Sequence, residues 1–138
     1  MKLSTTVISL VTFFSVVSAV NVGYDSTYDN AEGSLTTVAC SDGENGMITK
    51  GFTTFGSLPT FPNIGAAQAV GGWNSTACGT CWQILYEQQS MTVIAIDHAH
   101  NGFVVSRGAM NSLTNGQAQN LGIINAQATQ VDKSNCKL

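Results

Sequence analysis

The stretch Met91-Thr92-Val93-Ile94-Ala95-Ile96 is apolar at almost every position, and Asp97 follows it directly. A short run of this kind predicts a central β-strand that is buried on both faces. A carboxylate at the end of such a strand is costly unless it is hydrogen-bonded or used. Two interpretations of Asp97 stay open. It lines a ligand groove at the rim of a barrel, or it caps the next turn by accepting backbone N–H bonds.

Shorter apolar or alternating runs lie on both sides of this strand, separated by Asp-Gly, Asn-Gly and Gly-Gly turn signals. The predicted strands are 21–24, 48–54, 82–86, 92–96, 103–105 and 123–131. Ser106 is placed to cap a short helix that Gly116 ends, and a second helical turn is expected over 117–121. The stretch 55–72 holds both prolines and is expected to be an ordered loop. Roughly six short strands favour one closed barrel or sandwich.

The N-terminus has the features of a cleavable signal peptide. Lys2 precedes an apolar run that ends at Val17, and Ala19 occupies the expected cleavage position. The run is shorter than the roughly 20 apolar residues that a membrane-spanning helix needs. We therefore expect residues 1–19 to be a signal peptide and residues 20–138 to be a secreted, extracellular domain with no membrane span.

All four cysteines, Cys40, Cys78, Cys81 and Cys136, fall in the expected mature domain. An even number in a small secreted domain predicts two disulfides, and three pairings are open. The Cys-x-x-Cys motif could instead be a redox pair, but no thioredoxin-like pattern surrounds it. A zinc site is disfavoured because the extracellular compartment is oxidising.

Charged residues are scarce: five Lys and Arg stand against eight Asp and Glu, for a formal net charge of −3. The absence of a basic patch argues against nucleic acid and anionic membranes as partners. Ser, Thr, Asn, Gln and Gly must supply the polar surface, which suits neutral hydrogen-bonding ligands such as glycans. The sequon Asn74-Ser75-Thr76 makes Asn74 a candidate glycosylation site on an exposed loop.

His98 and His100 would share one face of a strand, which is a chelating geometry. The sequence has two histidines in all, so a metal site would need a carboxylate from elsewhere. Exposed or loop-packed histidines are therefore the default interpretation, and neither a metal nor a cofactor is expected.

Glycoside hydrolysis needs two carboxyl groups, about 5–5.5 Å or 6.5–9.5 Å apart. Asp97 is one candidate, and the sequence does not show which other acid lies near it. The candidate partners are Asp25, Asp29, Asp42 and Glu44. A Gly-x-Ser-x-Gly motif is absent from the sequence, which weighs against that class of esterase.

Several aromatic residues could stack on sugar rings. Tyr24, Tyr28 and Trp73 have Gly, Asn or Asp beside them, which favours exposure. Trp82 and Phe103 fall inside predicted strands and are more typical of a core.

Seven segments together resemble the cerato-platanin family of fungal secreted proteins. They are 24–30 (YDSTYDN), 38–43 (VACSDG), 54–59 (TFGSLP), 72–75 (GWNS), 78–82 (CGTCW), 95–97 (AID) and 109–116 (AMNSLTNG). The resemblance covers essentially all of residues 20–138. It implies a mainly β fold, namely a six-stranded double-psi β-barrel with short helices and the disulfides Cys40–Cys78 and Cys81–Cys136.

The resemblance also implies a protein that is not an enzyme. Family members bind chitin or N-acetylglucosamine oligomers in a shallow groove, sit in the fungal wall or medium, and elicit plant defence. Some loosen cellulose in an expansin-like way. The expected partners are therefore these oligomers, other wall polysaccharides and a plant surface receptor.

Asp97 matches the acid that the family keeps at this groove, and Asn101 is expected to contact the sugar with it. The expected neighbours are Tyr24, Asp25, Tyr28, Asp42 and Asn45. The histidines that follow Asp97 depart from the small polar residues typical of the family. Two alternatives remain: a weak lytic glycosidase that uses Asp97 with a second carboxylate, and an interfacial, self-assembling wall protein.

Overall fold

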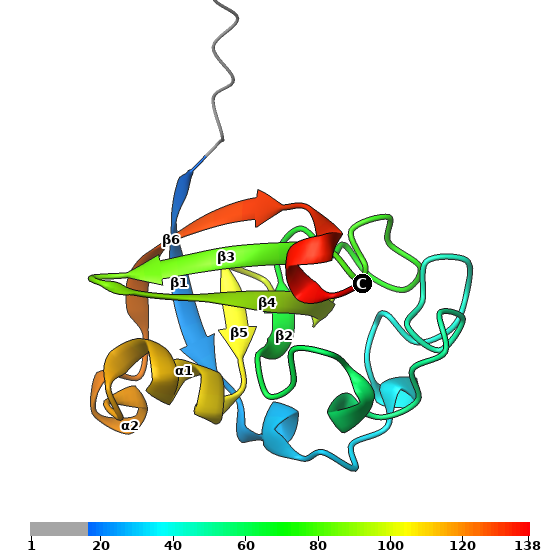
Figure 1. Cartoon of the computed structure of the whole chain (residues 1–138), viewed down its shortest axis with the longest axis horizontal. Coiled ribbons are helices and arrows are strands. Elements are labelled where there is room, and N and C mark those ends of the chain that lie inside the picture. Colours follow the sequence, from blue (N-terminus) through cyan, green and yellow to red (C-terminus); the bar gives the residue numbers. More distant parts are fainter. Residues whose placement is uncertain (1–16) are drawn as a thin grey trace, which may run out of the picture.

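Residues 17–138 are described by the structure, which is a computed structural model. They form a closed barrel of six strands in the order β1-β5-β2-β4-β3-β6 (Figure 1). The strands are β1 (Ser18–Tyr24), β2 (Ile64–Ala67), β3 (Cys81–Tyr86), β4 (Gln89–His98), β5 (Phe103–Val105) and β6 (Ile124–Val131). The β1–β5 and β2–β4 pairs are parallel, and the other neighbouring strands are antiparallel.

Two disulfides fasten the barrel to its connections. Cys40–Cys78 joins two loops, and Cys81–Cys136 joins the start of β3 to the C-terminal 3-10 turn η4 (Lys133–Cys136). The pairing is the one that the resemblance implied. Because all four sulfurs form these bonds, the redox-pair and zinc interpretations do not hold. The predicted fold class, a mainly β, six-stranded double-psi barrel with short helices and two disulfides, is confirmed.

The central strand predicted over 92–96 is part of β4. Its residues Val93, Ile94, Ala95 and Ile96 are all buried, as the apolar run predicts. β3 pairs with β4 only as far as Ile94, and after that residue loops supply the hydrogen-bond partners along this edge of β4. The N–H of Gly79 donates to the carbonyl of Ala95, and the N–H of Cys40 donates to that of Ile96.

One predicted strand is wrong. Residues 48–51 form turns, in which the N–H groups bond locally: that of Lys50 donates to the carbonyl of Met47, and so does that of Phe52, just after the turns. Thr54 forms only an isolated bridge with Ser34. Gly51 adopts a φ of +99°, which ends any extended run there.

The missing sixth strand is β2, which lies inside the stretch expected to be a loop. Its sequence, Ile-Gly-Ala-Ala, is poor in residues with high β-propensity. A side chain at Gly65 would overlap the carbonyl oxygen of Val104 on β5. The strand therefore depends on close backbone approach rather than on a hydrophobic pattern.

The other elements agree with their sequence signals. Buried and exposed residues alternate along most of β6, as the predicted half-buried strand requires. Helix α1 (Arg107–Thr114) begins where the Ser106 hydroxyl accepts the N–H of Ala109 at 3.0 Å. It ends at Asn115, in the left-handed region, one residue before the expected Gly116. Helix α2 (Ala118–Leu121) stops at Gly122.

The helices and the long loops lie on opposite sides of the barrel. Figure 1 shows α1 and α2 at one end, and the connections around residues 38–50 and 70–80 at the other. Among residues 17–138, no helix is both long enough and apolar enough to cross a membrane. Most of the expected signal peptide, residues 1–16, lies outside the described residues, and the start of the mature domain at Val20 stays a prediction.

Candidate functional site

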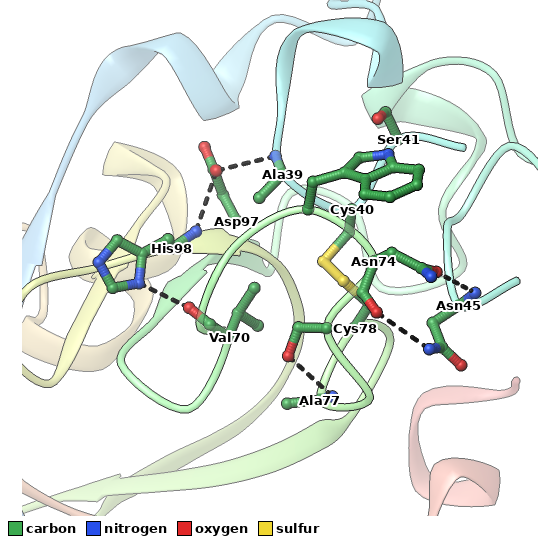
Figure 2. The surroundings of a disulfide bond; sticks show 12 residues. Ala39, Cys40, Ser41, Asn45, Val70, Asn74, Ala77, Cys78, Asp97 and His98 are labelled. Carbon is green, nitrogen blue, oxygen red and sulfur yellow. Dashed lines mark hydrogen bonds between the residues drawn. A yellow bond between two sulfur atoms is a disulfide. The ribbon is translucent and has the colours of Figure 1, made fainter. Parts of the chain in front are cut away.

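Asp97 lies near the end of β4, where the strand ladder gives way to loops. Its Oδ1 accepts the backbone N–H of Ala39 at 3.0 Å and that of His98 at 2.9 Å (Figure 2). Its Oδ2 accepts the hydroxyl of Tyr28 at 2.9 Å. A carboxylate offers about four acceptor directions, so one direction remains at Oδ2 of this half-buried side chain. Asp97 therefore organises the surrounding backbone and keeps acceptor capacity for a ligand.

Tyr28 was expected to be exposed, and this expectation is wrong. The side chain is only 8% exposed. It belongs to the 3-10 turn η1 (Ser26–Asp29), which turns its ring toward Phe55, with ring centroids 6.0 Å apart. Burial raises the pKa of the Tyr28 phenol, and the charge and hydrogen bond of Asp97 raise it further. Tyr28 thus stays protonated and acts as a donor that positions Asp97.

The loop that follows Ala39 links this carboxylate to a second polar group. The disulfide between Cys40 and Cys78 fixes the loop against the connection before β3. Further along, the carboxylate of Asp42 accepts the indole N–H of Trp73 at 2.7 Å. The Trp73 side chain is 64% exposed. A large aromatic ring is therefore held at the surface instead of packing into the core.

Asn45 and Asn74 hold the same two loops together. The Asn45 N–H donates to Oδ1 of Asn74 at 2.9 Å, and the Asn45 side-chain amide donates to the Asn74 carbonyl at 3.0 Å (Figure 2). Asn74 is half-buried and adopts a φ of +58°. Glycosylation at Asn74 stays a prediction.

The remaining predicted site residues, Asp25, Tyr24 and Asn101, differ in burial and in their hydrogen bonds. Asp25 caps η1 by accepting the N–H of Thr27 at 2.8 Å, and its charge contributes to the raised pKa of Tyr28. Tyr24 is half-buried at the end of β1. Asn101 is exposed in the turn after β4, and the structure shows no hydrogen bond from it to Asp97. Asp97, Tyr28 and Asp25 thus form one group, and Asp42 and Asn45 belong to the neighbouring loop.

Three of the four acids considered as partners for hydrolysis, Asp25, Asp29 and Asp42, accept structural hydrogen bonds of their own. Asp29 accepts the backbone N–H groups of Arg107 and Gly108, at 2.7 and 2.8 Å, and so caps α1. Asp42 holds Trp73. Asp97 itself is a three-fold acceptor, whereas a general acid must donate a proton in the reaction. This hydrogen bonding favours recognition over acid catalysis.

Trp73 is the residue that the predicted site set omitted. Its flanking residues, Gly72 and Asn74, indicated exposure, but no sequence pattern indicates its bond to Asp42, 31 residues away. Ala39 contributes only its backbone N–H, so its residue type does not indicate that it belongs to the site. For metals, the described residues contain no group of three or more His, Cys, Asp or Glu that could hold an ion.

Comparison with known proteins shows similarity in sequence and similarity in structure. The model of the cerato-platanin family matches residues 20–138. The sequence is 48% identical over 117 residues to Allergen Asp f 15 of Aspergillus fumigatus, which covers 85% of this chain and 76% of that protein.

Solved structures agree with the sequence match. Cerato-platanin 3 from M. perniciosa is 53% identical with a TM-score of 0.85, and the match covers 88% of this chain and all of that one (100%). The solution structure titled as the fungal elicitor Cerato-Platanin is 35% identical with a TM-score of 0.76, over 84% of this chain and 95% of that one. Because its sequence matches the family model over residues 20–138 and its fold matches solved members, the chain belongs to the cerato-platanin family.

Proposed function

We propose that the protein is a secreted, non-catalytic fungal wall protein or effector that binds chitin or N-acetylglucosamine oligomers. One observation carries the proposal: the half-buried Asp97 carboxylate at the end of β4 keeps one acceptor direction and is hydrogen-bonded to the same loop that holds an exposed indole. Asp97 and Trp73 are linked through the loop from Ala39 to Asp42. A polar acceptor and an exposed aromatic face held by one loop are a combination that suits a sugar ring.

The two groups recognise different parts of an amino sugar. The remaining acceptor direction on Asp97 suits a sugar hydroxyl or the N–H of an N-acetyl group. The exposed face of the Trp73 indole provides an apolar surface for the C–H face of the ring. Because the surface is open and has few charges, we expect affinity in about the micromolar to millimolar range.

The predicted neighbours take supporting roles in this proposal. Asp25, Asn45 and Asn101 offer polar atoms along the flanks of a longer oligomer, and Tyr24 offers a half-buried ring. Tyr28 acts indirectly, because its buried hydroxyl orients the Asp97 carboxylate.

The wider biological role rests on the family. Since a solved relative is titled an elicitor, we propose that this protein elicits plant defence through a plant surface receptor and resides outside the cell, in the fungal wall or medium. Expansin-like loosening of wall polysaccharides is part of the same proposal, because it requires binding without bond cleavage.

The direct test is titration of the N-acetylglucosamine tetramer into the oxidised protein, followed by NMR shifts and tryptophan fluorescence. The chain has two tryptophans, and we expect the tetramer to change the emission of exposed Trp73. Trp73→Ala and Asp97→Asn should each weaken binding by about tenfold, an ordinary loss for one stacking or charged contact. Ile123→Ala is the matched control, because Ile123 is similarly exposed, at 68%, but lies beside Gly23 on β1.

Two results would reject the proposal. One is the absence of shifts at millimolar tetramer, and the other is equal weakening by Ile123→Ala. Release of reducing ends from chitin or glucan by wild type, lost in Asp97→Asn, would favour the glycosidase alternative instead. For elicitation, infiltration of leaves with wild type and with Trp73→Ala would show whether the sugar-binding surface is required.

A further inference from the structure

The two histidines of the chain lie together at the end of β4. His98 ends the strand and His100 follows the buried Ala99, so both imidazoles emerge on one side. Both are exposed, and their ring centroids are 5.2 Å apart with an interplanar angle of 79°. Because both rings are exposed, they do not contribute to the barrel core. We therefore ask what ligand two neighbouring imidazoles could bind.

The His98 ring is held in a defined orientation. Its Nδ1 lies 2.6 Å from the carbonyl oxygen of Val70 (Figure 2). A carbonyl only accepts hydrogen bonds, so Nδ1 carries a proton. In the neutral ring Nε2 then has a free lone pair, and Figure 2 shows this second nitrogen on the side of the ring away from Val70. A histidine whose other ring nitrogen donates to a backbone carbonyl has the orientation typical of metal ligands.

The separation of the rings suits a shared ion. Two imidazole nitrogens bound about 2.0–2.1 Å from one tetrahedral ion place the ring centroids roughly 5 Å apart. The observed 5.2 Å is therefore compatible with both rings on one ion. Nearby, Asp97 already accepts three hydrogen bonds and keeps a single acceptor direction, and the cysteines form disulfides.

We propose that His98 and His100 form a two-ligand chelating site for a divalent transition-metal ion, with water completing the coordination. Imidazole favours Cu²⁺, Ni²⁺ and Zn²⁺, and Cu²⁺ binds most tightly at a given nitrogen site. Since no described group of three or more ligating residues surrounds the pair, the ion keeps positions that are open to solvent. This site is separate from the sugar surface in its ligand, although the two adjoin at β4.

The test is titration of Cu²⁺ into the oxidised, full mature protein, followed by electron paramagnetic resonance and calorimetry. We expect one ion per chain, with hyperfine coupling to two imidazole nitrogens. His98→Gln or His100→Gln alone should weaken binding at least about tenfold, because loss of one arm removes the chelate effect. The double variant measures the background from the terminal amine and backbone, and circular dichroism confirms that each variant is folded.

Three results would overturn the proposal. Wild-type affinity in the double variant would place the ion elsewhere. Unchanged affinity in both single variants would mean that the imidazoles bind independently. A spectrum with one coupled nitrogen would mean that the rings do not converge. Tetramer titration of the double variant separates this proposal from the proposed function, because sugar binding that survives loss of both histidines leaves the sugar site standing.

Discussion

The barrel and the loop half of this molecule are stabilised in different ways. In the barrel, neighbouring strands satisfy one another's backbone groups, and β4 is buried along most of its length. In the loop half, residues 25–63 and 70–80, many N–H groups bond to nearby turn carbonyls or to specific polar side chains, and those of Cys40 and Gly79 bond to β4. Both halves have buried apolar residues, including Leu35, Met47 and Phe55 in the loops. The loops are thus ordered, but individual polar residues determine their paths.

This difference explains where the candidate site lies. A strand ladder leaves little freedom to place a new polar group, because its backbone partners are all within the sheet. The loop half depends on side chains such as Asp97 and Asn74, which reach across long sequence distances. Under the proposed function, the residues that fix the loops are also those that face a ligand, so experiments must separate their structural and functional effects.

The largest expected effect comes from removing the disulfides one at a time. In the chain-entropy model, loops of 38 and 55 residues make each bond worth about 4 kcal/mol. We expect Cys40→Ser/Cys78→Ser to expose amides in the loop half to hydrogen exchange while the barrel strands stay protected. The reciprocal variant, Cys81→Ser/Cys136→Ser, should expose η4 and the start of β3.

Equal loss of protection in both halves after either double substitution would contradict this division. It would mean that loops and barrel unfold as one cooperative unit. Thermal unfolding of each variant supplies the global measurement with which the local exchange is compared.

The second effect is loss of the carboxylate at position 97. Asp97→Ala leaves two backbone N–H groups and the Tyr28 hydroxyl without their acceptor. We expect a loss of about 2–3 kcal/mol in the free energy of unfolding, because a charged acceptor is removed from three donors, of which Tyr28 is buried. Denaturant unfolding measures it. Asp132→Ala is the matched control, because it removes an exposed cap from η4 on the barrel side, and its effect should be smaller.

If the two substitutions cost the same, Asp97 would be an ordinary cap, and its conspicuous position after β4 would reflect turn formation only. A larger cost for Asp97→Ala supports a central role in the loop half. Asp97→Asn, which keeps one acceptor oxygen, should lie between wild type and Asp97→Ala.

The same division shows what the sequence could predict. The apolar run of β4, the alternation of β6 and the Ser106 cap each encode a local structure, and each prediction is confirmed. By contrast, β2 was missed because its Gly and Ala residues carry little hydrophobic pattern, and the close approach of Gly65 to β5 leaves no signal in the sequence. The 48–54 run looked like a strand, but its N–H groups bond to nearby turn carbonyls.

The site was predictable in part for the same reason. Asp97 could be singled out because a carboxylate after a buried strand is unusual. Its bond to Ala39, 58 residues away, could not be inferred, since any residue type can offer a backbone N–H there. Burial of Tyr28 was missed because polar neighbours in sequence do not show that a turn directs the ring inward.

A third, smaller effect is expected from Tyr28→Phe, which removes one donor to Asp97 and little else. The hydrogen bond to a charged acceptor suggests a loss of about 1.5–3 kcal/mol at neutral pH, nearer the lower end because Asp97 keeps two donors. The pKa of Tyr28 is raised in the folded protein. Above about pH 10 the unfolded phenol ionises first, so the tyrosine's contribution to stability is present below that pH and declines above it.

Unfolding measured at pH 8 and near pH 11 tests this sign. The gap in stability between wild type and Tyr28→Phe should narrow as the pH rises. The chain has three tyrosines, so absorbance titration provides a second readout, in which one phenol ionises only when the protein unfolds. A constant gap and three equivalent phenols would show that Tyr28 is not buried against Asp97.

The smallest effect concerns a contact between the two halves. Lys50, in the loop half, lies beside Gly79, and burial lowers its pKa, with the charge of Lys133 in η4 lowering it further. Below the folded pKa of Lys50 both ammonium groups are charged and repel each other; this cost is relieved as the pH rises toward the ordinary lysine value. Lys133→Gln should therefore stabilise the protein at neutral pH by about 0.2–0.5 kcal/mol at low salt, as expected for exposed charge pairs. Lys137→Gln is the control, because it changes the net charge by the same amount at a position that does not act on Lys50. An equal gain in stability in both variants would contradict the prediction, as would a gain that persists in 1 M salt. Either result would mean that the contact between the loop half and the barrel is not responsible.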